Sequence, residues 1–300
     1  MMRTVFIKHP RDITRKPLMK VTLIGTCLAG VFILLLNLSV PAAAQTQPAS
    51  SRAPDKTSGK ASVEELAKLK QNPVSGLRQL LVDIVVSPDS GGSGETEGVY
   101  SLQLVWPFSL NEDWKLITYT ILPLAQLPDA SGGDSVVGLS NTLINLFVAP
   151  KKPGAIIWGV GPAILLPTRT DPSLGSDHPE LGPALVLFYE KNEWSGGVVA
   201  QNVWSLGGSG IDEVNEFSAQ YIFNYNLPRG WFLYSNATIT ADWVEHSDDR
   251  WTVPVGGGFG KVFNIGNQSM SAALQGFSNV VTPEGGSKWA LNFQFALLFP

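Results

Sequence analysis

Residues with potential catalytic chemistry gather at one point of the sequence. The tetrapeptide Glu245-His246-Ser247-Asp248 brings a base, a candidate nucleophile and two carboxylates together, a combination that would suit a lipid hydrolase. His246 and Ser247 are adjacent, however, and adjacent residues on a strand point to opposite faces, which disfavours proton transfer between them. A hydrolase is therefore the weakest functional alternative, and we expect no catalytic residues and no enzyme activity.

His178 is the other histidine beyond residue 44, and it lies between Asp177 and Glu180. Imidazole and carboxylate groups are metal ligands in proteins, so His178 and His246 could bind a metal ion together. Both fall in segments that we predict to be loops, where histidines beside acidic residues are usually only hydrated. We expect no metal site and no cofactor.

Two glycine-rich stretches resemble known binding motifs but lack key residues. Residues 256–261 would need a glycine at Val255 and a serine or threonine at Val262 to form a phosphate-binding loop. Residues 207–210 are followed by Ile211, where a nucleophile elbow has its last glycine. We therefore interpret the first stretch as a thin part of a strand, where the strand bends or a neighbour approaches.

The composition excludes two broad classes of protein. Hydrophobic residues make up 44% of the 300 residues, which is enough for a large core and rules out disorder over most of the chain. Charged residues make up only 15%, whereas a soluble domain usually has about 25%. The net charge of −4 gives no basis for nucleic-acid binding.

The first 44 residues have the pattern of a secretory signal peptide. Six basic residues precede an apolar run at 21–40, and Ala42-Ala43-Ala44 follows as a small-residue cleavage site. Cleavage would remove Cys27, the only cysteine, and leave 15 basic against 24 acidic residues. An uncleaved anchor is an alternative because the run is long enough to span a bilayer, and a lipoprotein attached through Cys27 is a weaker one.

A linker and a short helix follow the predicted signal. Residues 45–61 are rich in Pro, Ser, Ala and Thr without periodicity, which predicts a disordered linker. Ser62 and Glu65 match a capping box, and an apolar stripe that includes Leu66 continues to Pro73. This pattern predicts a short helix at 62–72.

Residues 76–300 have the alternation of a many-stranded antiparallel protein. We predict an all-β fold, an antiparallel transmembrane β-barrel of about twelve strands with a short N-terminal helix. The predicted strands are 76–86, 99–107, 115–124, 136–148, 155–166, 181–190, 196–206, 216–226, 231–243, 251–264, 268–281 and 288–299.

Two of these strands separate an aromatic face from an amide-rich face. In 216–226 we expect the aromatic residues to face lipid, and these are Phe217, Tyr221, Phe223 and Tyr225. The polar residues of the opposite faces of three strands are the candidate lumen-facing residues: Ser218, Gln220, Asn224, Asn236, Thr238, Thr240, Asn292 and Gln294. A soluble sandwich enzyme is an alternative for this pattern, because such a face would also suit contact with a second sheet.

The connections between predicted strands alternate between long and short. The long connections, among them 87–98 and 167–180, are mostly acidic, whereas Lys151, Lys152 and Arg229 lie in short ones. Outer-membrane barrels have short periplasmic turns and longer external loops. In a soluble sandwich, nothing requires the connections at the two ends to differ in length and charge. This asymmetry therefore favours the barrel.

Several motifs resemble a family of bacterial outer-membrane proteins, some of which carry the label neuromedin U. The resemblance covers residues 62–300 and includes the motifs at 107–114, 158–162, 202–205, 224–231 and 251–258. This family is loosely related to barrels of the MetA-pathway phenol-degradation type, grouped with transporters of hydrophobic compounds. The resemblance implies an envelope protein without a defined substrate, and Pro300 after the terminal Phe299 is a departure from the usual outer-membrane ending.

These observations predict an outer-membrane pore or transporter for small, neutral or hydrophobic solutes, because few charges fall in the strands. The expected partners are outer-membrane lipids with lipopolysaccharide, the barrel-assembly machinery and a small solute. The alternative is a structural or adhesive outer-membrane barrel that transports nothing. We also expect that the predicted 62–72 helix partly occludes the periplasmic mouth, against the alternative of a frayed helix.

Overall fold

The computed structural model describes residues 61–90, 95–128, 135–207 and 213–300. The predicted signal peptide lies outside these residues, as does the predicted linker except for Ala61. Within the described residues, no helix is both long and apolar enough to cross a membrane.

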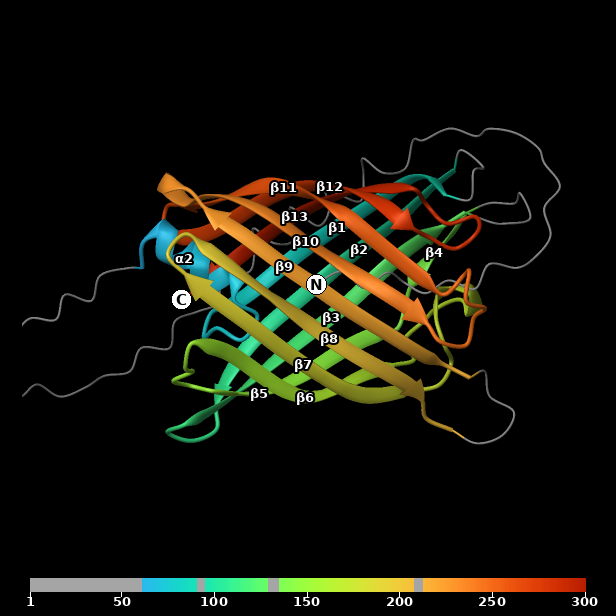
Figure 1. Ribbon diagram of the computed structural model, residues 1–300, viewed down its shortest axis with the longest axis horizontal. Coiled ribbons are helices and arrows are strands. Elements are labelled where there is room, and N and C mark those ends of the chain that lie inside the picture. The colour runs from blue at the N-terminus through green and yellow to red at the C-terminus, as the bar shows by residue number, and fades with distance from the viewer. Residues whose placement is uncertain (1–60, 91–94, 129–134, 208–212) are drawn as a thin grey trace, which may run out of the picture. The chain divides into compact units, whose positions relative to one another are not determined.

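Thirteen strands form one antiparallel sheet, and twelve of them close into a barrel (Figure 1). β1 pairs with β2 on one side and with β13 on the other, which joins the first strand to the last. The strands are β1 (Arg78–Ser90), β2 (Glu95–Ser109), β3 (Trp114–Leu127), β4 (Val136–Leu139), β5 (Thr142–Pro150), β6 (Ile156–Leu166), β7 (Glu180–Lys191), β8 (Trp194–Ser205), β9 (Asn215–Asn226), β10 (Trp231–Asp242), β11 (Trp251–Ile265), β12 (Gln268–Val281) and β13 (Trp289–Phe299).

β4 is the extra strand, and it arises where one predicted strand divides. β3 pairs with both parts of the predicted 136–148 strand, but Leu124 faces Leu139 whereas Ile121 faces Leu143. The register therefore shifts by one residue between the two pairings, as in a β-bulge. Ser140 and Asn141 lie at this shift.

The outer face of the barrel is apolar and is bordered by tryptophans at both ends. Leu185, Leu233 and Phe259 are among the large apolar side chains exposed in the middle of strands. All nine tryptophans lie near strand ends: Trp106, Trp114, Trp158, Trp194 and Trp231 at one end, and Trp204, Trp243, Trp251 and Trp289 at the other. An apolar band between two aromatic girdles is the surface of a transmembrane β-barrel.

The two ends of the barrel differ in their connections. Short turns such as those between β7 and β8 and between β11 and β12 share one end, and the longer loops share the other. One predicted long loop, 87–98, is shorter than expected, because β1 continues to Ser90 and β2 begins at Glu95. Polar residues at these strand ends had the composition of a loop, although cross-strand pairing carries them into the sheet.

The helix α2 (Val63–Gln71) lies at the end with the short turns, close to the start of β10 (Figure 1). The Ser62 side chain accepts a hydrogen bond from the backbone N–H of Glu65 at 3.1 Å and caps the helix. Two short 3₁₀ helices complete the described elements, η1 (Pro172–Leu174) after β6 and η2 (Pro228–Gly230) before β10.

The glycines of β11 lie where neighbouring strands approach closely. A Cβ atom at Gly256 or Gly258 would lie 1.9 Å from a carbonyl oxygen of β12. Side chains are therefore excluded at these positions, which agrees with the interpretation of residues 256–261 as a thin part of a strand.

Candidate functional site in the barrel lumen

α2 packs against the inner faces of several strands at one end of the barrel. Leu66 and Ala67 are completely buried, and they belong to one apolar cluster with Phe232 of β10, Val262 of β11 and Leu298 of β13. Burial of Leu66 alone stabilises the docked helix by about 2 kcal/mol. The helix is therefore packed in the mouth and does not lie free outside it.

Polar contacts also hold the C-terminal end of α2 to the barrel. The Gln71 side chain donates to Asn226 Oδ1 at 2.8 Å, and its Oε1 accepts from Ser195 Oγ at 3.1 Å. Asn224 donates to the same Ser195 hydroxyl at 3.1 Å. At the other end of α2, the Glu64 carboxylate accepts from the backbone N–H of Arg229 at 2.9 Å.

Lys70 carries a positive charge from α2 towards the lumen. Its Nζ lies 5.5 Å from the centre of the Phe232 ring, a cation–π contact. Desolvation lowers the pKa of the Lys70 ammonium group to about 8, although attraction to Asp83 opposes this shift. Docking of α2 therefore places a lysine where its charged form is disfavoured.

A chain of polar side chains crosses the inner faces of β1, β13 and β12 beyond α2. Asn292 Nδ2 donates to Asp83 Oδ1 at 2.8 Å, and Gln275 Nε2 donates to Asn292 Oδ1 at 2.9 Å. The three side chains are at most 2% exposed. Nearby in the sheet, the Tyr119 hydroxyl bonds to the side-chain oxygen of Gln103.

The opposite side of the barrel interior is mainly apolar. Buried residues from β3, β5, β7 and β8 form one hydrophobic cluster, which includes Ile121, Leu143, Phe147, Val186 and Phe188. The inside of the barrel thus has a chain of polar side chains on β12, β13 and β1. The inner faces of β3 to β8 are mainly apolar, although they also contain the buried Asn145 and Gln201.

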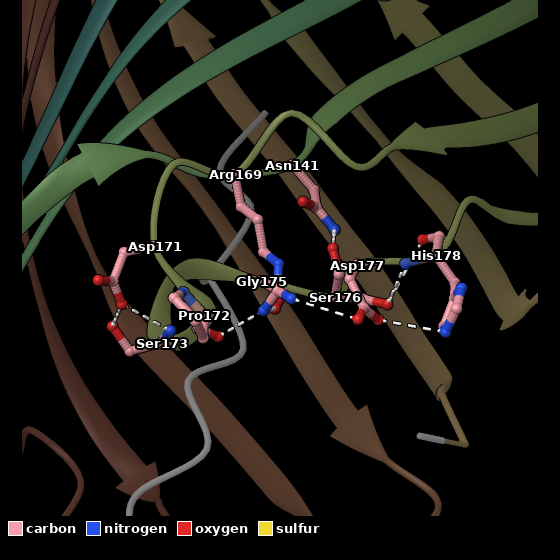
Figure 2. Close-up of polar contacts among 9 residues, drawn as sticks. All are labelled: Asn141, Arg169, Asp171, Pro172, Ser173, Gly175, Ser176, Asp177 and His178. Atoms are coloured by element: carbon pink, nitrogen blue, oxygen red, sulfur yellow. Dashed lines mark hydrogen bonds and ion pairs between the residues drawn. The ribbon is translucent and has the colours of Figure 1, made fainter. Parts of the chain in front are cut away.

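The connection between β6 and β7 folds into the other end of the barrel (Figure 2). Arg169 Nη1 donates to the carbonyls of Pro172 at 2.8 Å and Gly175 at 2.9 Å, and Nη2 lies 3.5 Å from Asp177 Oδ2. Asn141 Nδ2 donates to the Ser176 carbonyl at 3.0 Å and ties this connection to the β4–β5 bulge. The connection is therefore held in one conformation by its own polar contacts.

Leu174 is the apolar tip of this connection. Its side chain is completely buried in a cluster with Val85, Val99, Leu127 and Ala290, which lie on β1, β2, β3 and β13. Leu174 therefore reaches from the β6–β7 side to the opposite wall. Asp171 caps η1 by accepting from the Ser173 backbone N–H at 2.9 Å and from its hydroxyl at 2.7 Å, and these bonds lower the pKa of the Asp171 carboxyl.

The predicted lumen-facing residues lie on the more buried faces of β9, β10 and β13. Gln220, Asn224, Thr238, Thr240, Asn292 and Gln294 are buried, and Ser218 and Asn236 are half-buried. Asn292 joins the chain that contains Asp83 and Gln275, whereas Asn224 belongs to the separate group around Gln71. The aromatic residues predicted to face lipid alternate with them, and Phe223 is 52% exposed.

Several residues of this site were not predicted from the sequence. Asp83 had a visible signal, because it is a single carboxylate in an otherwise apolar stretch, and such residues in membrane segments are usually functional. Gln275 and Gln103 gave no comparable signal, since each is one polar residue in a strand of mixed composition. The packing of Leu174 against other strands could not be predicted, because long connections have no periodicity that indicates which of their residues are buried.

The Glu245–Asp248 motif lies in the connection between β10 and β11, outside the lumen. His246 and Ser247 are exposed, and the Ser247 hydroxyl donates to Asp248 Oδ1 at 3.2 Å. His178 Nε2 lies 3.3 Å from Asp177 Oδ1 in the β6–β7 connection. Among the described residues, no three His, Cys, Asp or Glu side chains gather as a metal ion would require.

The closed sheet, the apolar outer band and the two girdles define an outer-membrane-type β-barrel. Residues 54–295 match the family described as "Putative MetA-pathway of phenol degradation", and the chain belongs to this family. The description of the matched family does not include the neuromedin U label. No curated protein matches the chain.

Two solved structures are similar to this chain at low sequence identity. The COG4313 outer membrane channel from Pseudomonas putida F1 is 18% identical, with a TM-score of 0.57 over 75% of this chain and 96% of that one. Outer membrane phospholipase A from Escherichia coli is 13% identical, with a TM-score of 0.44 over 79% of this chain and 98% of that one. Similarity to the first structure supports the fold of this chain.

Proposed function

We propose that the chain is an outer-membrane channel for small, uncharged and largely apolar solutes, with α2 at the periplasmic mouth. The name of the COG4313 structure describes a channel, and transport is the function that the lumen supports best. An apolar wall would bind the body of an aromatic or aliphatic solute. Amides and hydroxyls on the other wall would replace the water around its polar atoms.

Unsatisfied polar atoms inside the barrel carry this proposal. Within the described structure, the buried Gln275 Oε1, Gln201 Oε1, Tyr234 Oη, Thr238 Oγ1 and Ser271 Oγ have no hydrogen-bond partner. A core that serves only stability satisfies almost all of its buried polar groups, because an unpaired one costs about 1–3 kcal/mol. Polar atoms without partners are instead available to a solute or to water that moves with it.

A structural barrel without transport is the second candidate, because both ends are occupied. α2 packs into one mouth and Leu174 into the other. A barrel filled by its own side chains would stay closed after either insert was removed. In a channel, removing an insert would widen the path through the lumen.

Conductance in planar bilayers separates these two functions. We expect low conductance from the intact protein and a clear rise from a variant that lacks residues 45–72 but keeps the preceding signal. Leu66→Asp should also raise conductance, because a buried carboxylate would expel α2. Glu65→Ala, at an exposed position of the same helix, is the control and should behave like the intact protein. Equally low conductance from all folded variants would favour the structural barrel.

A further inference from the structure

The backbone ladder between β10 and β11 is interrupted in the middle of the barrel wall. Trp231 to Tyr234 pair with Lys261 to Gly258, and Thr240 and Ala241 pair with Thr252 and Trp251. Five consecutive positions between these pairs, 235–239 on β10 and 253–257 on β11, do not pair with one another although the register is the same on both sides. By contrast, the ladder between β9 and β10 continues without a gap from Phe232 to Asp242.

Side chains bridge this β10–β11 seam in place of the ladder. The Ser235 hydroxyl donates to the Gly256 carbonyl at 2.5 Å, and the Tyr221 hydroxyl of β9 donates to the Pro254 carbonyl at 3.3 Å. Tyr221 faces Ala237 in the β9–β10 register, so its ring must cross β10 over this small residue. Gln275 of β12 donates to the Asn236 carbonyl at 3.1 Å across the glycines of β11.

The sequence of β11 explains why the ladder fails here. Pro254 has no N–H to donate, and the register of β11 with β12 shifts between Val253 and Pro254, as in a bulge. Glycines at 256 and 257 add no side chain that could pack between the strands. Parting this seam therefore breaks a few side-chain hydrogen bonds, whereas parting any continuous ladder would break a row of backbone bonds.

The seam also lies beside unsatisfied groups of the lumen. Thr238 belongs to the stretch of β10 that does not pair with β11, and Gln275 already reaches across the seam to β10. In the described structure, Thr238 Oγ1 and Gln275 Oε1 are buried without hydrogen-bond partners. The outer surface at the same height is the apolar band that faces lipid. The seam thus separates a polar binding surface from the membrane interior.

We propose that the β10–β11 seam is a lateral exit through which a small uncharged aromatic solute leaves the lumen into the lipid, with Tyr221 and Ser235 as its latch. The inference rests on the proposed channel function. Both axial ends carry packed inserts, so a route through the wall avoids displacing α2. The lipid phase also suits an apolar solute better than water does.

A disulfide across the seam tests this exit directly. In a Cys27→Ser background, the test pair is Ser235→Cys with Gly257→Cys, because a Cβ atom at Gly257 would lie 3.9 Å from the Ser235 Cβ, close to the spacing of a disulfide. Ser235→Cys with Phe223→Cys, register partners across the continuous β9–β10 ladder, is the matched control. The probe is naphthalene, and its entry is measured in cells that otherwise lack the protein.

Oxidation of the test pair should reduce naphthalene entry to that of cells without the protein, and reduction should restore it. The control pair should have no effect. Unchanged entry with the disulfide formed across the seam would overturn the lateral exit while leaving the channel intact. If the unmodified protein does not increase naphthalene entry at all, the proposed channel function itself fails.

The combined variant Tyr221→Phe and Ser235→Ala tests the latch without a new covalent bond. It removes the two hydroxyls that bridge the seam on the outer side while keeping the size of the side chains nearly unchanged. We expect naphthalene entry to increase several-fold. Entry equal to that of the unmodified protein would contradict the latch.

Discussion

The hydroxyl of Tyr221 on β9 bonds to the carbonyl of Pro254 on β11, with β10 between them. Neighbouring strands in a barrel normally satisfy each other's carbonyls, so a bond over an intervening strand marks a place where the ladder has failed. Tyr221 can reach Pro254 because Ala237 is small and Pro254 faces a stretch of β10 that does not pair with β11. A tyrosine predicted simply to face lipid thus has a second role in closing the wall.

The lowered pKa of Lys70 predicts that α2 docks more tightly in alkali. The docked lysine has a pKa of about 8 and an undocked one has about 10.5, so the undocked state binds more protons between these values. Docking should therefore strengthen as the pH rises from 8 to 10.5. Protease cleavage within residues 62–71 would measure undocking, and Lys70→Met should abolish the pH dependence. Docking that strengthens with pH should reduce cleavage between pH 8 and 10.5. An increase in cleavage over this range would contradict the prediction.

Truncation of Leu174 should loosen the β6–β7 connection. Leu174→Ala removes a fully buried side chain and should cost the docked conformation about 2–5 kcal/mol. Single-channel recordings should then show larger or noisier currents, especially in a protein that also lacks α2. Leu166→Ala changes an exposed leucine of β6 and serves as the control. Currents that are identical for the two variants would place the constriction elsewhere.

The cap of η1 should make the β6–β7 connection sensitive to acid. Hydrogen bonds from Ser173 lower the pKa of Asp171 below its ordinary value of 3.8. Its contribution is therefore present above pH 3.8 and is lost as the pH falls through the lowered pKa. Current noise should rise in that acidic range. Asp171→Asn keeps an acceptor oxygen without the titrating group, and the rise should be absent in this variant.

The lipid-facing surface can be tested by placing charge at different depths. Leu185 is exposed in the middle of β7, so Leu185→Arg should reduce the free energy of unfolding by about 2–4 kcal/mol. Val137 is exposed on β4 at the end with the longer loops, and Val137→Arg should cost about 0–1 kcal/mol. Denaturant titrations of the protein refolded in lipid vesicles would measure both. Equal costs would contradict the assigned membrane band.

Strands could be predicted from the sequence because a period of two has a local cause. In Trp289–Phe299, apolar residues alternate with Asn292 and Gln294, and each residue faces lipid or lumen according to its parity alone. The same period of two places the candidate residues of β9 and β10 on one face. The exact ends of β1 and β2 depend on pairing between strands, which local composition does not encode.

Long-range contacts could not be predicted in this way. Leu174 lies about ninety residues from Val85, and nothing in the composition of its loop indicates that it packs against β1. The gap between β10 and β11 depends on Pro254, on a bulge against β12 and on side chains from β9 and β12. Each of these features is unremarkable alone, and only their arrangement in the barrel leaves the ladder open.

Solute entry into living cells tests the channel function most directly. The measurement compares naphthalene with naphthalenesulfonate in a strain that lacks the protein and in the same strain expressing the full chain. The channel account predicts faster entry of naphthalene when the chain is present and no change for the charged sulfonate. Equal naphthalene entry in the two strains, with the barrel correctly assembled, would contradict the account.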